Sequence, residues 1–234
     1  MADSLNTNTN PAVRTRLVVF QDAPLAFEKI SAFRGYVNKV MNWQEPQLHN
    51  HLYKPDGSTG EDYRYPLVQY RVVDGCAALF GLNEGCQLIE NFINSPNLDS
   101  QYGQFADYAN QRSTVGLGQQ AQRYYIGQWA ALNNANYEDF KNTPYLSDRV
   151  AMLERILQNH LKNFCNAIGY RYPDHALWVR ILDCAEPQHK KFTSEKGKIP
   201  MLTFGLSYHS NLLMPNLLGM GRGKSKGFGV QLRG

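Results

Sequence analysis

The order of apolar segments along the first 93 residues places the strongest constraint on the fold. Residues 13–20 (VRTRLVVF) predict a strand because they are rich in Val, Leu and Phe. Residues 24–41 predict a helix, since a proline opens the segment and its apolar residues recur near the helical period. Strands at 64–73 and 76–82 and a short helix at 83–93 follow. This strand–helix–strand–strand–helix order is most of a ferredoxin-like unit, which one further strand would complete.

Local turn chemistry supports these boundaries. The pair Asp74-Gly75 predicts a hairpin turn between the two strands, and Asn83 is a residue type that caps helix N-termini. The completing strand is expected within residues 101–132, with 122–132 (QRYYIGQWAAL) as the best candidate. Residues 94–118 show no regular pattern.

The second half of the chain contains one strongly amphipathic helix. Its apolar face runs from Val150 to Ile168, with Ser147 or Asp148 as the expected cap and Gly169 as the end. Further elements are expected after it: strands at 177–184, 199–208 and 227–233, and a short helical turn at 212–218.

Composition excludes several classes of protein. With 43% hydrophobic and 19% charged residues, the 234-residue chain is not wholly disordered. No apolar run reaches the roughly 20 residues of a membrane helix, and the polar N-terminus lacks the apolar core of a secretory signal. The four cysteines form no CxxC pair, so we expect no zinc site and predict small, buried, reduced thiols in a cytoplasmic protein.

Charge is concentrated near the C-terminus. Residues 187–234 contain eight lysines and arginines and one acid, Glu195, a net charge of +7, so the other 186 residues carry −3 of the chain's +4. This asymmetry indicates a localised site for a polyanion. The alternative, for residues 189–198 alone, is a solvated basic loop.

A glycine-rich segment, GMGRGKSKGFG, lies within this basic region at residues 219–229. Glycines allow the backbone to approach a ligand, and the three cations attract phosphate. The segment is not a P-loop, because Leu218 stands where the first glycine would be, and it follows a predicted helix and precedes a strand, unlike GxGxxG. A polynucleotide backbone therefore suits it better than a mononucleotide, and a flexible hairpin with incidental lysines is the alternative. The candidate RNA-binding residues are Gly219, Gly221, Arg222, Gly223, Lys224, Ser225, Lys226, Gly227 and Gly229.

The tripeptide His49-Asn50-His51 carries two imidazoles that titrate near neutral pH. Residues i and i+2 share a face in an extended segment, so both rings could face one substrate. In RNA, one ring could take the proton of the attacking 2′-hydroxyl and the other protonate the leaving group, without a metal. Two alternatives stay open: a metal site completed by Glu61 or Asp62, and a purely structural pair.

Several segments resemble one protein family. They are Phe33-Arg34-Gly35, Leu48-His49-Asn50-His51, residues 65–70 (YPLVQY), the glycine turn at 81–85 and the glycine-rich segment at 219–229. In this order they resemble the b-type branch of the Cas-six family, the CRISPR-associated endoribonucleases that cut repeat RNA. Residues 94–146 carry no recognisable signature.

The resemblance implies an α+β fold of tandem ferredoxin-like (RRM-like) domains with a C-terminal glycine-rich loop. We therefore expect a disordered tail at residues 1–12, an N-terminal domain at 13–146 and a C-terminal domain at 147–234.

The resemblance also implies metal-independent cleavage of precursor crRNA within each repeat, leaving 5′-hydroxyl and 2′,3′-cyclic phosphate ends. His49 and His51 would be the acid–base pair, Lys39 and either Tyr63 or Tyr65 would assist, and Arg34 would bind phosphate. No metal or other cofactor is expected. The expected partner is CRISPR repeat RNA, with other effector subunits and a homodimer left open. The alternative function is a non-catalytic RNA-binding subunit of a CRISPR effector complex, although mere binding does not require two imidazoles.

Overall fold

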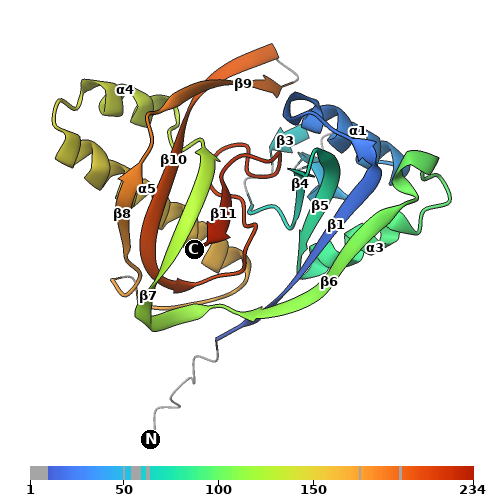
Figure 1. Ribbon diagram of the computed structural model, residues 1–234, viewed down its shortest axis with the longest axis horizontal. Coiled ribbons are helices and arrows are strands. Elements are labelled where there is room, and N and C mark those ends of the chain that lie inside the picture. Colours follow the sequence, from blue (N-terminus) through green and yellow to red (C-terminus); the bar gives the residue numbers. More distant parts are fainter. Residues whose placement is uncertain (1–9, 50, 54–58, 62–63, 174, 195–196) are drawn as a thin grey trace, which may run out of the picture.

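Two antiparallel sheets, each covered by helices, form the body of the molecule (Figure 1). The computed structural model describes residues 10–234 except 50, 54–58, 62–63, 174 and 195–196. Residues 1–9 of the expected tail lie outside the described residues.

The N-terminal sheet has the strand order β4-β5-β1-β6, with every neighbouring pair antiparallel. Its elements, in chain order, are β1 (Ala12–Pro24), η1 (Phe27–Lys29), α1 (Ile30–Val40), β4 (Val68–Val73), β5 (Cys76–Leu82), α3 (Glu84–Ile93), η2 (Ser100–Tyr102) and β6 (Phe105–Thr114). This is the predicted ferredoxin-like unit. The Asp74-Gly75 turn is also confirmed: both residues have positive φ, 50° and 76°, as a type I′ hairpin turn requires.

The strand that completes this unit is β6, not the predicted segment 122–132. It lies within the expected window of residues 101–132, and residues 94–118, which show no regular pattern in the sequence, contain η2 and the whole of this strand. As an edge strand of polar composition, β6 has many exposed side chains, so it lacks the hydrophobic alternation that identifies a strand.

The second sheet has the order β11-β7-β10-β8, with β9 pairing to a further part of β10. Its elements are β7 (Gly116–Trp129), α4 (Asn134–Asn142), α5 (Leu146–Ala167), β8 (Val179–Cys184), β9 (Gln188–Ser194), β10 (Gly197–Leu213) and β11 (Val230–Arg233). The order repeats the ferredoxin-like arrangement. Between β10 and β11, where such a unit has its second helix, this chain has the glycine-rich segment instead.

Three local predictions in this half are wrong. The expected helical turn at 212–218 is the end of β10 followed by a turn at residues 216–217. The basic stretch 189–198 is not a solvated loop, because β9 and β10 form a hairpin there. The α5 helix is confirmed and ends at Gly169, with φ 73°, but the Ser147 hydroxyl donates to Asp148 and does not cap the helix.

The chain changes from one sheet to the other between β6 and β7, well before the expected boundary at residues 146/147. The reason is the pairing of β7 with β10 and β11, which joins residues separated by 75 to 109 positions and leaves no mark in the local pattern.

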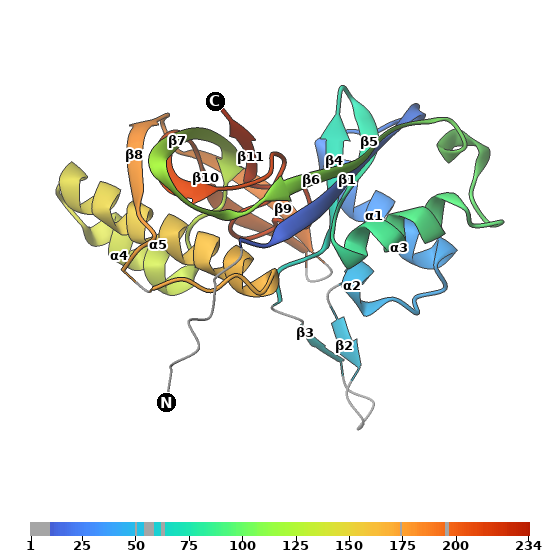
Figure 2. The same cartoon turned by 90° about the horizontal axis from the view of Figure 1, so that it is seen from below.

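The faces of the N-terminal sheet are buried against different partners. Val18 and Phe20 pack with α1 and α3, whereas Val13, Phe80 and Leu82 belong to the same apolar cluster as α5 and the second sheet. The two halves therefore share one apolar cluster, and the N-terminal half has a second cluster of its own under α1 and α3. In Figure 2, α5 lies beneath the second sheet, and the small hairpin of β2 (His51–Tyr53) and β3 (Thr59–Glu61) projects away from both sheets.

The four cysteines were predicted to be buried free thiols. Cys86 and Cys165 are buried, whereas Cys76 is half-buried and Cys184 is exposed, so the prediction is right for two of the four cysteines and wrong for the other two.

None of the helices within the described residues is long and apolar enough to cross a membrane.

Candidate functional site

The tripeptide His49-Asn50-His51, called the two-histidine segment below, begins in a short helix, α2 (Pro46–His49). This helix packs against α1. Leu48 is buried in the apolar cluster beneath α1. Its carbonyl oxygen accepts hydrogen bonds from the Tyr70 hydroxyl at 3.1 Å and from the Asn38 side-chain amide at 3.5 Å. The residue immediately before His49 is therefore held by both its side chain and its backbone.

Tyr70 on β4 provides a stable anchor for this carbonyl. Its side chain is fully buried, and burial raises the pKa of the phenol. The hydroxyl therefore stays a neutral donor at physiological pH. Asn38 is fixed in turn by donating to the Arg34 carbonyl, one turn earlier in α1, at 2.7 Å.

His49 ends α2 and His51 begins β2, where it pairs with Glu61. The prediction of one continuous extended segment is therefore wrong, because the backbone changes from helix to strand within three residues. The side chains of both histidines, Asn50, Tyr63 and Asp62 lie outside the described parts of the structure. Within the described residues, no group of three or more His, Cys, Asp or Glu side chains is arranged to hold a metal.

Of the assisting residues suggested by the sequence, Lys39 is exposed in the last turn of α1, the helix that packs against α2. Arg34 lies on the same helix, close enough to Tyr70 for electrostatic interaction. Tyr65 is in a different position: its buried hydroxyl donates to the Gly219 carbonyl at 2.9 Å, and burial raises its pKa to about 12. The structure therefore makes Tyr65 a structural residue.

The glycine-rich segment lies between the two halves and pairs with both. On one side, the Tyr70 amide of β4 donates to the Ser225 carbonyl at 2.8 Å, next to a parallel bridge between Tyr70 and Lys226. On the other, the Arg222 amide donates to the Ala130 carbonyl at 3.0 Å. The segment therefore extends the edge of the N-terminal sheet while remaining attached to the end of β7.

A buried arginine that the sequence analysis missed organises this segment. Arg71 is 2% exposed. Its guanidinium donates to the carbonyls of Tyr70 at 3.0 Å and of Lys224 and Leu217 at 3.1 Å, and to the Gln69 side chain. Its described partners are all neutral oxygens, and burial lowers its pKa to about 10, so it remains charged at neutral pH. The signal in the sequence was a charged residue within a strand that is otherwise apolar except for Gln69.

Packing explains the glycines better than ligand approach does. Gly219, Gly221 and Gly229 are buried. A Cβ at Gly219 would lie 2.6 Å from the Lys224 carbonyl oxygen, and one at Gly229 would collide with the Met220 carbonyl. Gly221 and Gly229 also have positive φ, 77° and 60°, which side chains rarely adopt.

The three cations of the segment occupy different environments. Arg222 is exposed, although one guanidinium nitrogen donates to the Leu132 carbonyl at 3.4 Å. Lys224 is half-buried, with its ammonium 5.6 Å from the centre of the Tyr65 ring, and burial lowers its pKa. Lys226 is half-buried. Arg222 is therefore the most accessible of the three to a polyanion.

His160 lies beneath this segment and has a structural role. Its Nδ1 accepts a hydrogen bond from the Trp129 indole at 3.2 Å. Burial, and then the nearby Lys224 cation, lower its pKa to about 4. The ring is therefore neutral in the folded protein at physiological pH.

Two protein-family models match nearly the whole chain. The model described as the Cas6b N-terminal domain matches residues 12–112, and the model described as the Cas6b C-terminal domain matches residues 116–232. The junction between the two matches falls where the chain passes from β6 to β7.

Solved structures with similar folds carry related descriptions. A crystal structure described as Cas6b has a TM-score of 0.78 at 21% identity, and one described as a CRISPR RNA processing endoribonuclease, Cas6b, has a TM-score of 0.69 at 21% identity. Csf5, described as a type IV Cas6 crRNA endonuclease, has a TM-score of 0.62 at 10% identity. Each comparison covers 96% of this chain and 100% of the other. Among curated proteins, none matches the chain significantly.

Loss of the buried cation should destabilise the whole protein. Arg71→Met leaves three carbonyl oxygens without their charged donor, so we expect the free energy of unfolding to fall by about 3 kcal/mol. Arg222→Met, which changes an exposed arginine of the same segment, should cost less than about 1 kcal/mol. Urea unfolding measures both. Similar losses in the two variants would show that Arg71 does not organise the segment.

Stability should also depend on pH through His160. The folded ring has its pKa lowered to about 4, whereas the unfolded ring takes up a proton near pH 6.5, so stability falls as pH drops from 6.5 towards 4. We expect the wild type to lose about 2 kcal/mol more free energy of unfolding between pH 7 and pH 5 than His160→Gln. Urea titrations at the two pH values measure this difference. Equal losses would mean that the folded ring accepts a proton as readily as the unfolded one.

Proposed function

Because the chain belongs to the Cas6b family, we propose that it is an endoribonuclease that cleaves precursor crRNA within CRISPR repeats. The observation that carries this proposal is the two-histidine segment, which lies within the matched residues 12–112 and is anchored at Leu48 by Tyr70 and Asn38. Support also comes from the solved structures of similar fold described as crRNA-processing enzymes.

The reaction proposed is an internal transesterification of RNA. The 2′-hydroxyl oxygen attacks the adjacent phosphorus while one histidine, acting as base, removes its proton. The bond from phosphorus to the 5′-oxygen breaks, and the second histidine, as acid, protonates that oxygen. The products are a 2′,3′-cyclic phosphate and a 5′-hydroxyl. His49 and His51 fill the two roles.

A fixed backbone contributes to such chemistry by holding the reacting groups in position. Helix α2 cannot rotate freely about Leu48 because the side chain is buried and the carbonyl has two donors. The segment that follows therefore starts from a defined point, which reduces the entropy lost when the substrate binds.

Positive charge near this segment would stabilise the transition state and hold the RNA. Lys39, exposed on α1, is the candidate for stabilising charge on the phosphorane oxygens. Arg34, on the same helix, is the candidate for an adjacent phosphate. In the glycine-rich segment, Arg222 binds the RNA backbone, whereas the glycines shape the segment.

Replacing each histidine should separate catalysis from binding. We expect His49→Ala and His51→Ala each to slow single-turnover cleavage by roughly 10²-fold or more, with little change in affinity for repeat RNA. Arg222→Ala should instead weaken binding and reduce the salt slope by about one unit, because one phosphate contact is lost. Rates at saturating protein and affinities across a salt series measure both effects. Normal cleavage by the histidine variants would show that His49 and His51 are not the catalytic pair, whereas a wild type that binds repeat RNA without cutting it would favour the non-catalytic RNA-binding alternative.

The nucleophile can be tested on the substrate. A 2′-deoxy substitution just 5′ of the scissile phosphate should abolish cleavage and leave binding almost unchanged, because it removes the attacking hydroxyl and little else. Cleavage of the all-ribose RNA should persist in excess EDTA, since imidazoles and the RNA supply the reacting groups. Gel analysis of both reactions is the measurement. Activity that disappears with EDTA and returns with a divalent cation would replace this mechanism by a metal-dependent one.

A further inference from the structure

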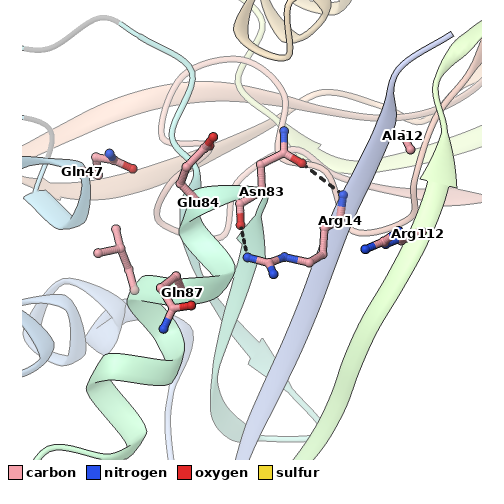
Figure 3. A pocket seen from close by; sticks show the side chains of 8 residues that line it. Ala12, Arg14, Gln47, Asn83, Glu84, Gln87 and Arg112 are labelled. Atoms are coloured by element: carbon pink, nitrogen blue, oxygen red, sulfur yellow. Dashed lines mark hydrogen bonds between the residues drawn. The ribbon is translucent and has the colours of Figure 1, made fainter. Parts of the chain in front are cut away.

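A cavity of about 700 Å³ opens between the N-terminal sheet, α2 and α3 (Figure 3). Its walls come from four elements: Arg14 of β1, Gln47 of α2, Glu84 and Gln87 of α3, and Arg112 of β6. This volume lies within the range of small-ligand sites, which is roughly 300–1,000 Å³. Gln47 belongs to α2, the short helix that ends at His49, so the cavity and the first candidate catalytic residue share one element.

One wall of the cavity is cationic. Arg14 and Arg112 are direct partners on the antiparallel strands β1 and β6, so their side chains emerge next to each other from the same face. Like charges in this position repel, and an anion between them would relieve the repulsion. Figure 3 shows Arg14 extending from β1 towards the start of α3, where it donates to the Asn83 carbonyl at 3.1 Å.

Asn83 accepts hydrogen bonds from this arginine, and its side chain does not cap α3 as the sequence predicted. Its side-chain oxygen accepts from the Arg14 amide at 3.1 Å, and its φ is 48°. The arrangement fixes Arg14 at the cavity on both its backbone and its guanidinium. A fixed cation loses less entropy on binding an anion than a free one does.

The opposite wall offers an unsatisfied acceptor. The side-chain oxygen of Gln47 is buried, and among the described residues it has no hydrogen-bond partner. Buried acceptors in proteins nearly always accept a hydrogen bond, and a bound ligand could supply the donor that this oxygen lacks. The amino and imino groups on the edges of nucleic-acid bases are such donors.

We propose that this cavity binds one unpaired nucleotide of the substrate RNA, next to the scissile phosphate. The nucleotide's phosphate lies at Arg14 and Arg112, and an N–H group of its base donates to Gln47. The inference rests on the proposed function, since Gln47 belongs to α2, the helix that ends at His49. In this assignment, Gln47 determines specificity for the base, and Arg112 binds the phosphate through its charge.

An RNA–protein double-mutant cycle tests this assignment. The probes are uncleavable 2′-deoxy repeat RNAs in which each nucleotide within three positions of the scissile phosphate is made abasic in turn. For the wild type, we expect one position at which the lost base weakens binding about tenfold. Gln47→Leu should bind the intact RNA about tenfold more weakly and show no further loss at that position.

Two arginine variants separate local recognition from general charge. Arg112→Gln should weaken binding of intact and abasic RNAs by the same factor, because it removes a phosphate contact. Arg180→Gln on β8, with a side chain that is 72% exposed, is the matched control and should bind like the wild type. Thermal unfolding checks that every variant is folded.

The results separate failure of the cavity from failure of the proposed function. The nucleotide site alone would be overturned if the wild type cleaves all-ribose RNA but the losses of binding free energy from Gln47→Leu and from each abasic position are additive. An Arg112→Gln variant that binds as the wild type does would also overturn it. Failure of the wild type to bind or cut repeat RNA would overturn both proposals.

Discussion

The buried guanidinium of Arg71 is the contact on which the rest of the structure depends. The second ferredoxin-like unit lacks one of its helices, and the glycine-rich segment that replaces it presents carbonyl groups inside the protein. Arg71 donates to the carbonyls of Leu217 and Lys224, and Gln69 accepts from the Gly219 amide at 3.0 Å. One strand of the N-terminal sheet thereby satisfies the segment that closes the other half of the molecule.

The alternation of side chains along β4 connects this contact to the candidate active site. Gln69 and Arg71 point to the glycine-rich segment, whereas Tyr70, between them, points to the helices and holds the Leu48 carbonyl. Because successive residues of a strand face opposite sides, three consecutive residues position the glycine-rich segment and the two-histidine segment at once. A shift of register in β4 would displace both.

The arrangement divides the work among residues that look alike in the sequence. Arg71 and Arg222 differ in burial and in partners: the first donates to carbonyl groups inside the protein, and the second is exposed. The glycines provide close contact and positive φ, so in the proposed function the contact with RNA falls to cationic side chains, of which Arg222 is the most exposed. The glycine-rich segment lies at the β4 edge of the N-terminal sheet. Arg14 on β1 and Arg112 on β6 add two cations on the other side of this sheet, at the cavity that Gln47 also lines.

The sequence by itself determined what short-range patterns encode. Hydrophobic periodicity and turn chemistry located β1, β5, α5 and the Asp74-Gly75 turn, and the resemblance pointed to His49 and His51, whose roles remain a proposal. Only the tertiary structure decided which strand completes the first sheet, where the chain passes to the second, and that Arg71 and Asn83 hold backbone groups. These outcomes depend on partners that are distant in the chain, such as β7 and β11. A polar edge strand or a single buried arginine has no periodic pattern from which its partner could be predicted.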